Sequence, residues 1–317
     1  MEFAACTHVG KIRKANEDNY YIPTPDGENY CQCFFAVADG MGGHNAGEIA
    51  SALAIRGMLN FLGKPGKLQD AMERPESTLM DGVDSTNKKI WMLGSFSEKC
   101  ANMGTTLTCA LCLPGRWVVA HVGDTRAYHI RGEQILQVTR DHSMVEDLVE
   151  QGVMEKDSPE YIMQRHILTR ALGVQRDEPG EVYQVPAQAG DLLLICSDGL
   201  SENVSPQEML EICSRMELQS ACEAMRDLAL NRGGTDNITL CKMCIRDSHG
   251  RGLDDLRDAA RPGGVGAAAP GPKHRDRGAD SKASCYRRSG DGAGSMVRLY
   301  RDQRQLGRLR PRDFAYH

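Results

Sequence analysis

The sequence predicts an antiparallel α+β fold. Strand-like runs come in pairs joined by short turns, long helical segments fall in clusters, and strands do not alternate regularly with helices. Regular alternation would instead predict a parallel sheet with βαβ units. The chain has 317 residues, of which 41% are hydrophobic, so it can bury a sizeable core in one large domain or two smaller ones.

Hydrophobic spacing separates strands from helices in the first part of the chain. Residues 6–22 have the pattern of a strand broken by a charged turn, and the apolar run 33–38 has the length of a buried strand. Residues 46–62 have apolar residues at helical spacing. The predicted buried face of that helix holds Ile49, Leu53 and Leu59. Residues 63–76, with two prolines, read as a loop, and 79–93 read as a second helix.

Two hairpins are predicted in the middle of the chain. The first joins runs 105–113 and 116–121, which are rich in Thr, Val and Cys, through Pro114-Gly115. The second joins 127–130 and 134–138 through Gly132-Glu133.

Helices dominate the prediction for the later part of the chain. Residues 144–151 form a short helix candidate, followed by a polar and irregular segment over 152–166. A second buried strand is predicted over 191–196. The remaining predictions are helices over 206–214 and 218–232 and a last strand over 238–242.

Charge divides the chain into a body and a tail. Residues 1–243 hold 22 of the 38 basic and 34 of the 43 acidic residues, so the body is acidic and the tail, which contains no Glu, is basic. We expect a folded domain over 1–242 and a separate tail over 243–317. The tail reads either as a disordered basic segment or as non-native translation, because residues 243–248 resemble the translation of a common sequencing adapter. We favour the second interpretation.

Composition also bears on location and partners. No run approaches the roughly 18–20 apolar residues that cross a bilayer, and the first residues lack the pattern of a signal peptide. The scattered cysteines favour reduced thiols. We therefore expect a cytoplasmic monomer that binds neither membranes nor, given its acidic body, nucleic acid.

Five short motifs place acidic residues beside glycines or turns. They are RKANED (13–18), DGMGGH (39–44), GDTR (123–126), SDG (197–199) and GGTDN (233–237). Taken alone, each Asp-Gly is most simply a turn residue. Together they could gather carboxylates that repel one another unless cations neutralise them. Ligand sets made only of oxygen select hard ions such as Mg²⁺ or Mn²⁺.

In this order, the five motifs resemble those of the metal-dependent protein phosphatases, called PPM or type 2C. The likeness is greatest to short bacterial members with a single domain, and it covers about residues 3–242. Connecting segments match as well, among them MGTT (103–106) and TRDHS (139–143). The resemblance implies a four-layer α-β-β-α sandwich, in which helices flank two antiparallel sheets and the metal site lies at one edge.

The resemblance also implies residue roles. Asp39 would bridge two metal ions, with the Gly40 carbonyl as a further ligand, and Asp198 and Asp236 would complete this primary site. Asp124, with Asp198, would hold a third and weaker ion, so that two to three Mn²⁺ or Mg²⁺ ions are expected.

Three further residues would act around these ions. Glu17 and Asp18 would act mainly through metal-bound waters. Arg13 would bind the substrate phosphate, because its planar guanidinium can contact two phosphate oxygens at once. Residues 144–168 correspond to the family's flap beside the active site.

The expected reaction is hydrolysis of phosphoserine and phosphothreonine in proteins. A metal-bound water loses its proton more readily than bulk water and can attack phosphorus directly. Many eukaryotic members have a histidine acid where this chain has Met41, and methionine cannot donate a proton. The general acid is therefore unassigned, with a metal-bound water favoured over His44.

The expected partners are phosphorylated proteins and a bacterial Ser/Thr kinase whose action the enzyme would reverse. Two other functions remain open at this stage. One is a pseudophosphatase that binds partners without catalysis, which the intact set of acidic residues disfavours. The other is a stage-specific phosphatase for an anti-anti-sigma partner, although such proteins usually carry sensor or membrane domains.

Overall fold

A computed structural model describes residues 1–23, 33–42 and 46–245. Two five-stranded sheets form the centre of this body, and every strand pair in them is antiparallel. The first sheet has the order β1-β12-β11-β8-β9 and the second has the order β10-β7-β6-β3-β2.

The strands of the first sheet are β1 (Glu2–His8), β8 (Arg126–Arg131), β9 (Gln134–Gln137), β11 (Leu192–Cys196) and β12 (Ile238–Cys244). Those of the second are β2 (Asn19–Tyr21), β3 (Phe34–Ala38), β6 (Leu107–Leu113), β7 (Arg116–Val122) and β10 (Glu181–Pro186). A small ladder joins β4 (Gly40–Met41) to β5 (Gly104–Thr105).

The two sheets pack face to face. Phe3 of β1 and Phe35 of β3 lie on opposite sheets, and their rings meet edge to face at 5.8 Å. Because successive side chains of a strand point to opposite faces, Leu193 and Ile195 join this core between the sheets. Leu194 and Cys196 instead join a second cluster on the outer face.

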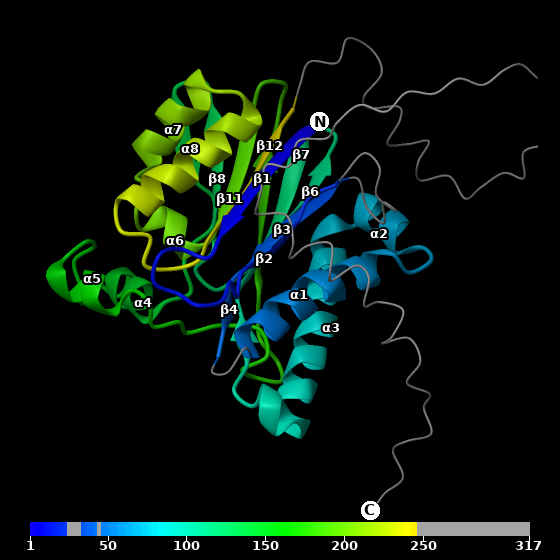
Figure 1. Ribbon diagram of the computed structural model, residues 1–317. Helices are drawn as coiled ribbons and strands as arrows, with labels where there is room; N and C mark the ends of the chain where they lie inside the picture. Colours follow the sequence, from blue (N-terminus) through cyan, green and yellow to red (C-terminus); the bar gives the residue numbers. More distant parts are fainter. Residues whose placement is uncertain (24–32, 43–45, 246–317) are drawn as a thin grey trace, which may run out of the picture. The chain divides into compact units, whose positions relative to one another are not determined.

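Helices cover both outer faces of the sandwich (Figure 1). One face carries α1 (Ala46–Leu62), α2 (Lys67–Glu73) and α3 (Pro75–Phe96), and the other carries α7 (Pro206–Arg215) and α8 (Leu218–Asn231). Short helices complete the described body: η1 (Glu98–Cys100), α4 (Met144–Glu150), α5 (Pro159–Gln164) and α6 (Asp198–Ser201). The predicted four-layer α-β-β-α sandwich is confirmed.

The buried face of α1 differs from the prediction, although its bounds agree. Ile49 is 39% exposed, and Leu53 and Leu59 are only half-buried. The buried side of the helix is formed by ten residues: Ala46, Gly47, Ala50, Ser51, Ala54, Ile55, Gly57, Met58, Phe61 and Leu62. Leu53 and Leu59 still pack against the core, so the predicted face lies beside the buried one, which includes many small residues.

Two segments predicted as irregular contain helices. The predicted loop over 63–76 includes α2 and the first two residues of α3, which begins at Pro75. The segment over 152–166 includes α5, which begins at Pro159 after a capping Ser158. In both helices a proline occupies a first-turn position, where its missing N–H costs nothing.

Two further differences concern strands. The prediction missed β10, an edge strand whose residues are mostly half-buried or exposed. The last strand, β12, ends at Cys244 rather than at residue 242. Met243 is fully buried between the sheets, and the Ile245 N–H donates to the Asp191 carbonyl at 3.1 Å. Residues 246–317 lie outside the described residues.

The fold brings the ends of several strands to one edge of the sandwich. Asp39 follows β3 and Asp198 follows β11, while Asp236 precedes β12. Asp124 lies in the turn between β7 and β8. The antiparallel registers place these four strand ends on the same side, which is where the motifs were expected to converge.

Replacing Phe35 by Ala should destabilise the protein by about 3–5 kcal/mol, because the change leaves a cavity between the sheets. The matched change Phe96→Ala removes a ring that is 83% exposed at the end of α3 and should cost less than about 0.5 kcal/mol. Urea unfolding measures both. Equal losses would contradict the described packing.

Candidate metal centre

The loop that carries the RKANED motif is held by one amide side chain. Asn237 Nδ2 donates to the carbonyls of Val9 at 2.9 Å and Ala15 at 3.0 Å. Its Oδ1 accepts from the Glu17 N–H at 2.8 Å. Asn237 thus fastens the segment between β1 and β2 to the start of β12, although some 220 residues of sequence separate them.

The backbone of Asp39 is fixed by two threonines of the MGTT motif. The Asp39 N–H donates to Thr106 Oγ1 at 2.9 Å, and its carbonyl accepts from the Thr106 N–H and from Thr105 Oγ1, both at 2.8 Å. These bonds hold the carboxylate at the tip of β3 in a defined position.

Gly40 is required because the first turn of α1 lies against it. A Cβ at this position would stand 2.2 Å from the Gly47 carbonyl oxygen and 2.6 Å from that of Glu17. The Gly40 N–H donates to the same Glu17 carbonyl at 3.2 Å. The DG dipeptide therefore joins the loop, the strand tip and the helix, and any larger residue would separate them.

Asp18 lies buried behind this junction. Its Oδ2 accepts from Ser197 Oγ at 2.8 Å, while its Oδ1 has no hydrogen-bond partner among the described residues. Burial raises the pKa of Asp18 to about 6, although hydrogen bonds to its carboxylate oppose the shift.

Asp39 and Asp198 are the most strongly perturbed carboxyls of the site. Burial, followed by the charges of Asp18, Asp198, Asp124 and Asp236, raises the pKa of Asp39 well above its usual range. Burial and the charges of Asp124 and Asp236 do the same to the pKa of Asp198. Asp198 Oδ1 is buried and has no hydrogen-bond partner in the described part of the chain.

Asp124 stands at the same edge, in a turn held by His142. The Gly123 N–H donates to His142 Nδ1 at 3.1 Å, and the His142 N–H donates to the Gly123 carbonyl at 2.7 Å. Burial and the charge of Asp141 raise the pKa of Asp124 to about 7, against the opposing charge of Arg126. His142 is thus a structural residue of the turn.

Arg13 does not stand free over the site. Its Nη2 donates to Asp236 Oδ2 at 2.7 Å, with the arginine side chain 52% exposed and that of the aspartate 32% exposed. The hydrogen bond to Asp236 raises the pKa of Arg13. A residue predicted to bind phosphate and a residue predicted to bind metal are therefore paired with each other.

The remaining predicted residues surround this pair or lie near it. Burial raises the pKa of Glu17, which also interacts with the charges of Arg13 and Asp236. Met41 is half-buried in β4, opposite Gly104 of β5. His44 lies outside the described residues.

The donor set fits a hard divalent cation. Within the described residues, no three or more His, Cys, Asp or Glu side chains already form a group that could hold a metal ion. The carboxylates interact through their charges instead, and two buried carboxylate oxygens lack hydrogen-bond partners. Mg²⁺ and Mn²⁺ prefer oxygen ligands, so a cation between these groups would relieve their repulsion.

Sequence reasoning missed the residues that position the carboxylates. Thr106, Ser197 and Asn237 each hold a neighbouring acidic loop through a side-chain hydrogen bond. All three lie within or beside the motifs that were recognised. A polar residue adjacent to a predicted ligand is the signal that could have identified them.

Comparison with known proteins identifies the family. A family model described as protein phosphatase 2C matches residues 13–231, which is more than half of the chain. The chain therefore belongs to the protein phosphatase 2C family. A serine/threonine phosphatase, stp, from Listeria monocytogenes serotype 4b is 36% identical over 249 residues, which span 78% of this chain and 97% of that protein.

Solved structures agree with this assignment. The catalytic domain of the serine/threonine protein phosphatase PstP, in complex with two manganese ions, matches with a TM-score of 0.66 and 34% identity over 78% of this chain and 98% of that chain. Stp1 from Staphylococcus aureus matches with a TM-score of 0.68 and 28% identity over 77% and 95%. No helix in the described ranges is long and apolar enough to cross a membrane.

Asp124→Asn should change the pH dependence of stability in metal-free protein. Because the pKa of Asp124 is about 7 when folded and near 4 when unfolded, its contribution to stability falls as pH rises through that range. The variant should therefore gain stability over the wild type between pH 5 and pH 8, by about 1 kcal/mol or more.

Urea unfolding in EDTA at the two pH values measures this difference. Asp81→Asn, on the exposed side of α3, is the matched control and should show no such trend. A stability difference between Asp124→Asn and wild type that is the same at pH 5 and pH 8 would contradict the described environment.

Proposed function

We propose that this chain hydrolyses phosphoserine and phosphothreonine in proteins, with Mn²⁺ or Mg²⁺ as cofactor. The observation that carries the proposal is the set of buried carboxylates at the sandwich edge, each raising the pKa of its neighbours. Relatives named serine/threonine phosphatases, and a relative's structure with two manganese ions, support the same reaction and cofactor.

We assign the cation ligands as follows. Asp39, the Gly40 carbonyl, Asp198 and Asp236 would hold the first two ions. Asp124, together with Asp198, would hold a third and weaker ion. The carboxylate oxygen of Asp198 that lacks a hydrogen-bond partner and the mutual repulsion of these groups support this assignment.

Glu17 and Asp18 are proposed to act through water rather than as direct ligands. One Asp18 oxygen is already taken by the Ser197 hydroxyl, which leaves the other for a water molecule. The Glu17 carboxylate stands near Arg13 and Asp236, at the more exposed side of the site.

Bound divalent cations at such a site supply an activated water as nucleophile and neutralise phosphate charge. Arg13 binds the phosphate oxygens, since its exposed guanidinium can leave Asp236 when a phosphate and cations compete for the two partners. The proton for the leaving serine or threonine oxygen comes from water, because Met41 has none to give.

The partners proposed are phosphorylated proteins and a Ser/Thr kinase whose products the enzyme reverses. We also propose that the protein acts as a cytoplasmic monomer. The flap over 144–168 would contact protein substrates, and it is tied together by hydrogen bonds from Tyr161 Oη at 2.5 Å and Lys156 Nζ at 2.9 Å to Glu146.

The domain proposed for catalysis covers residues 1–242 and continues to the end of β12. The Listeria relative supports this extent, because the match covers 97% of that protein but only 78% of this chain. The segment after the domain is proposed to play no part in catalysis.

The wild-type chain should release phosphate from a phosphothreonine peptide with Mn²⁺ or Mg²⁺ and stop when EDTA removes the metal. Asp198→Asn should lower kcat/KM at least about 100-fold, because it removes a charge that holds the cations. Asp81→Asn should retain full activity. Phosphate release is followed colorimetrically.

No turnover with either metal, while Mn²⁺ still raises the melting temperature, would replace this proposal with a pseudophosphatase that binds metal without catalysis. Full activity in EDTA, or in Asp198→Asn, would contradict the metal-dependent mechanism itself.

A further inference from the structure

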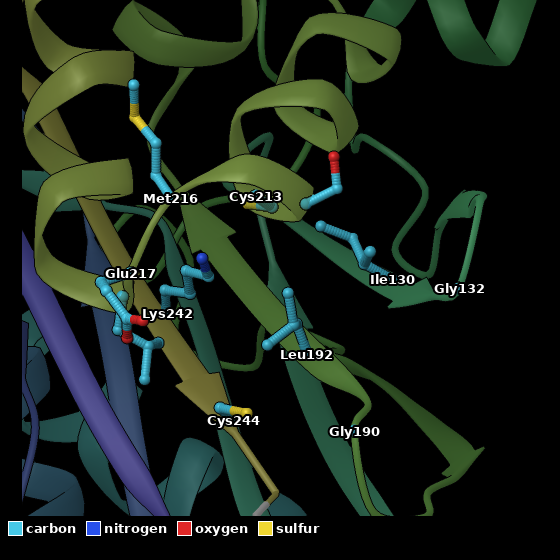
Figure 2. Close-up of a pocket in the computed structure, with 11 residues that line it drawn as sticks. Ile130, Gly132, Gly190, Leu192, Cys213, Met216, Glu217, Lys242 and Cys244 are labelled. Carbon is cyan, nitrogen blue, oxygen red and sulfur yellow. The ribbon is translucent and has the colours of Figure 1, made fainter.

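A pocket lies away from the metal-site carboxylates, on the outer face of the first sheet. It has a volume of about 300 Å³, at the lower end of the range for small-molecule sites, and opens between the α7–α8 region and β8, β11 and β12. Its walls include Ile130, Leu192, Met216 and Leu218, so much of the lining is apolar (Figure 2).

A buried lysine projects into this pocket. Lys242 is only 1% exposed, and its position in β12 faces the helices, like that of Leu240 in the same strand. Figure 2 shows its side chain reaching from β12 toward Cys213 of α7. Lysine is seldom fully buried and usually extends its ammonium group to water. A lysine that is fully buried is usually paired with a group of opposite charge.

The described groups nearest to the ammonium are two uncharged thiols. Lys242 hydrogen-bonds to the Cys213 thiol and lies near Cys222. Burial raises the pKa of both thiols, that of Cys222 to about 12, so both stay uncharged near neutral pH. No carboxylate in the described part of the chain forms an ion pair with Lys242. Removal of an ammonium from water without an anion beside it is costly.

The charge and shape of the pocket select the class of ligand. The ammonium group would pair with an anion, and the apolar walls would pack against a hydrocarbon part of the same ligand. Glu217 also lines the pocket. A single carboxylate on a short apolar chain satisfies both conditions.

We propose that this pocket binds a small monocarboxylate with an apolar body, whose carboxylate pairs with Lys242. The site is separate from the carboxylate edge, since Asp236 precedes the start of β12 and Lys242 lies four residues further along the strand from Ile238, or roughly 13 Å at the rise of a strand. Binding there does not require the proposed phosphatase activity, and a failure of one leaves the other standing.

Octanoate is a suitable probe, measured by isothermal titration calorimetry on the full chain. We expect one saturable site with Kd below about 1 mM, a value that lies within ordinary weak ligand binding. Acetate lacks the apolar body and 1-octanol lacks the charge, so each should bind at least about tenfold more weakly.

Two variants locate the site. Lys242→Met keeps the length of the side chain and removes the charge, so it should weaken octanoate binding at least about tenfold. Leu192→Trp should block the pocket while keeping the ammonium. Lys89→Met, on an exposed position of α3, is the matched control and should bind as wild type does.

Circular dichroism of each variant shows whether it is folded, and Leu192→Trp provides an independent test if Lys242→Met is not. Absence of octanoate binding up to about 10 mM would overturn the proposal. Equal binding of octanoate by wild type and both pocket variants would overturn it too, as would equal binding of octanoate and 1-octanol.

Discussion

Repulsion between carboxylates at one edge of the sandwich is the constraint on which this structure depends. Asp39 stands at the tip of β3, where burial and the charges of four other aspartates raise the cost of its own charge. Repulsion between these carboxylates does not stabilise the folded protein. Cations that bind in the folded state explain the cluster, because they relieve the repulsion and stabilise the form that binds them.

Hydrogen bonds around the carboxylates hold them in place against their mutual repulsion. Ser197, after β11 of the first sheet, holds Asp18 beside β2 of the second, and Asn237 connects loops that are distant in sequence. Thr106 fixes Asp39 from the adjacent strand of the same sheet. The acidic edge therefore forms only when both sheets are in place. Neutral side chains do this work, since they add no further negative charge to the site.

The acidic residues of the site could be predicted from the sequence more easily than the residues and elements that position them. The acidic motifs could be read because each Asp follows or precedes a strand-like run, and helix α1 could be bounded by its spacing. The full buried face of α1 could not be predicted from the sequence, because the alanines and glycines in it give little hydrophobic signal. The edge strand β10 was missed because few of its side chains are buried.

Contacts between distant segments were also beyond the reach of sequence patterns. The pairing of Arg13 with Asp236 joins two residues that the motifs assigned to different tasks. Lys242 reads as one polar residue in a strand, and only the packing of α7 and α8 makes it a buried charge. In both cases the environment, rather than the residue type, decides what the side chain can bind.

Crystals grown with Mn²⁺ would test the central claim most directly, through the anomalous scattering of manganese. Strong peaks surrounded by the carboxylates of Asp39, Asp198 and Asp236 are the expected result, with Arg13 released from Asp236. Manganese bound only elsewhere, or those three side chains directed away from one another around an empty edge, would contradict this account.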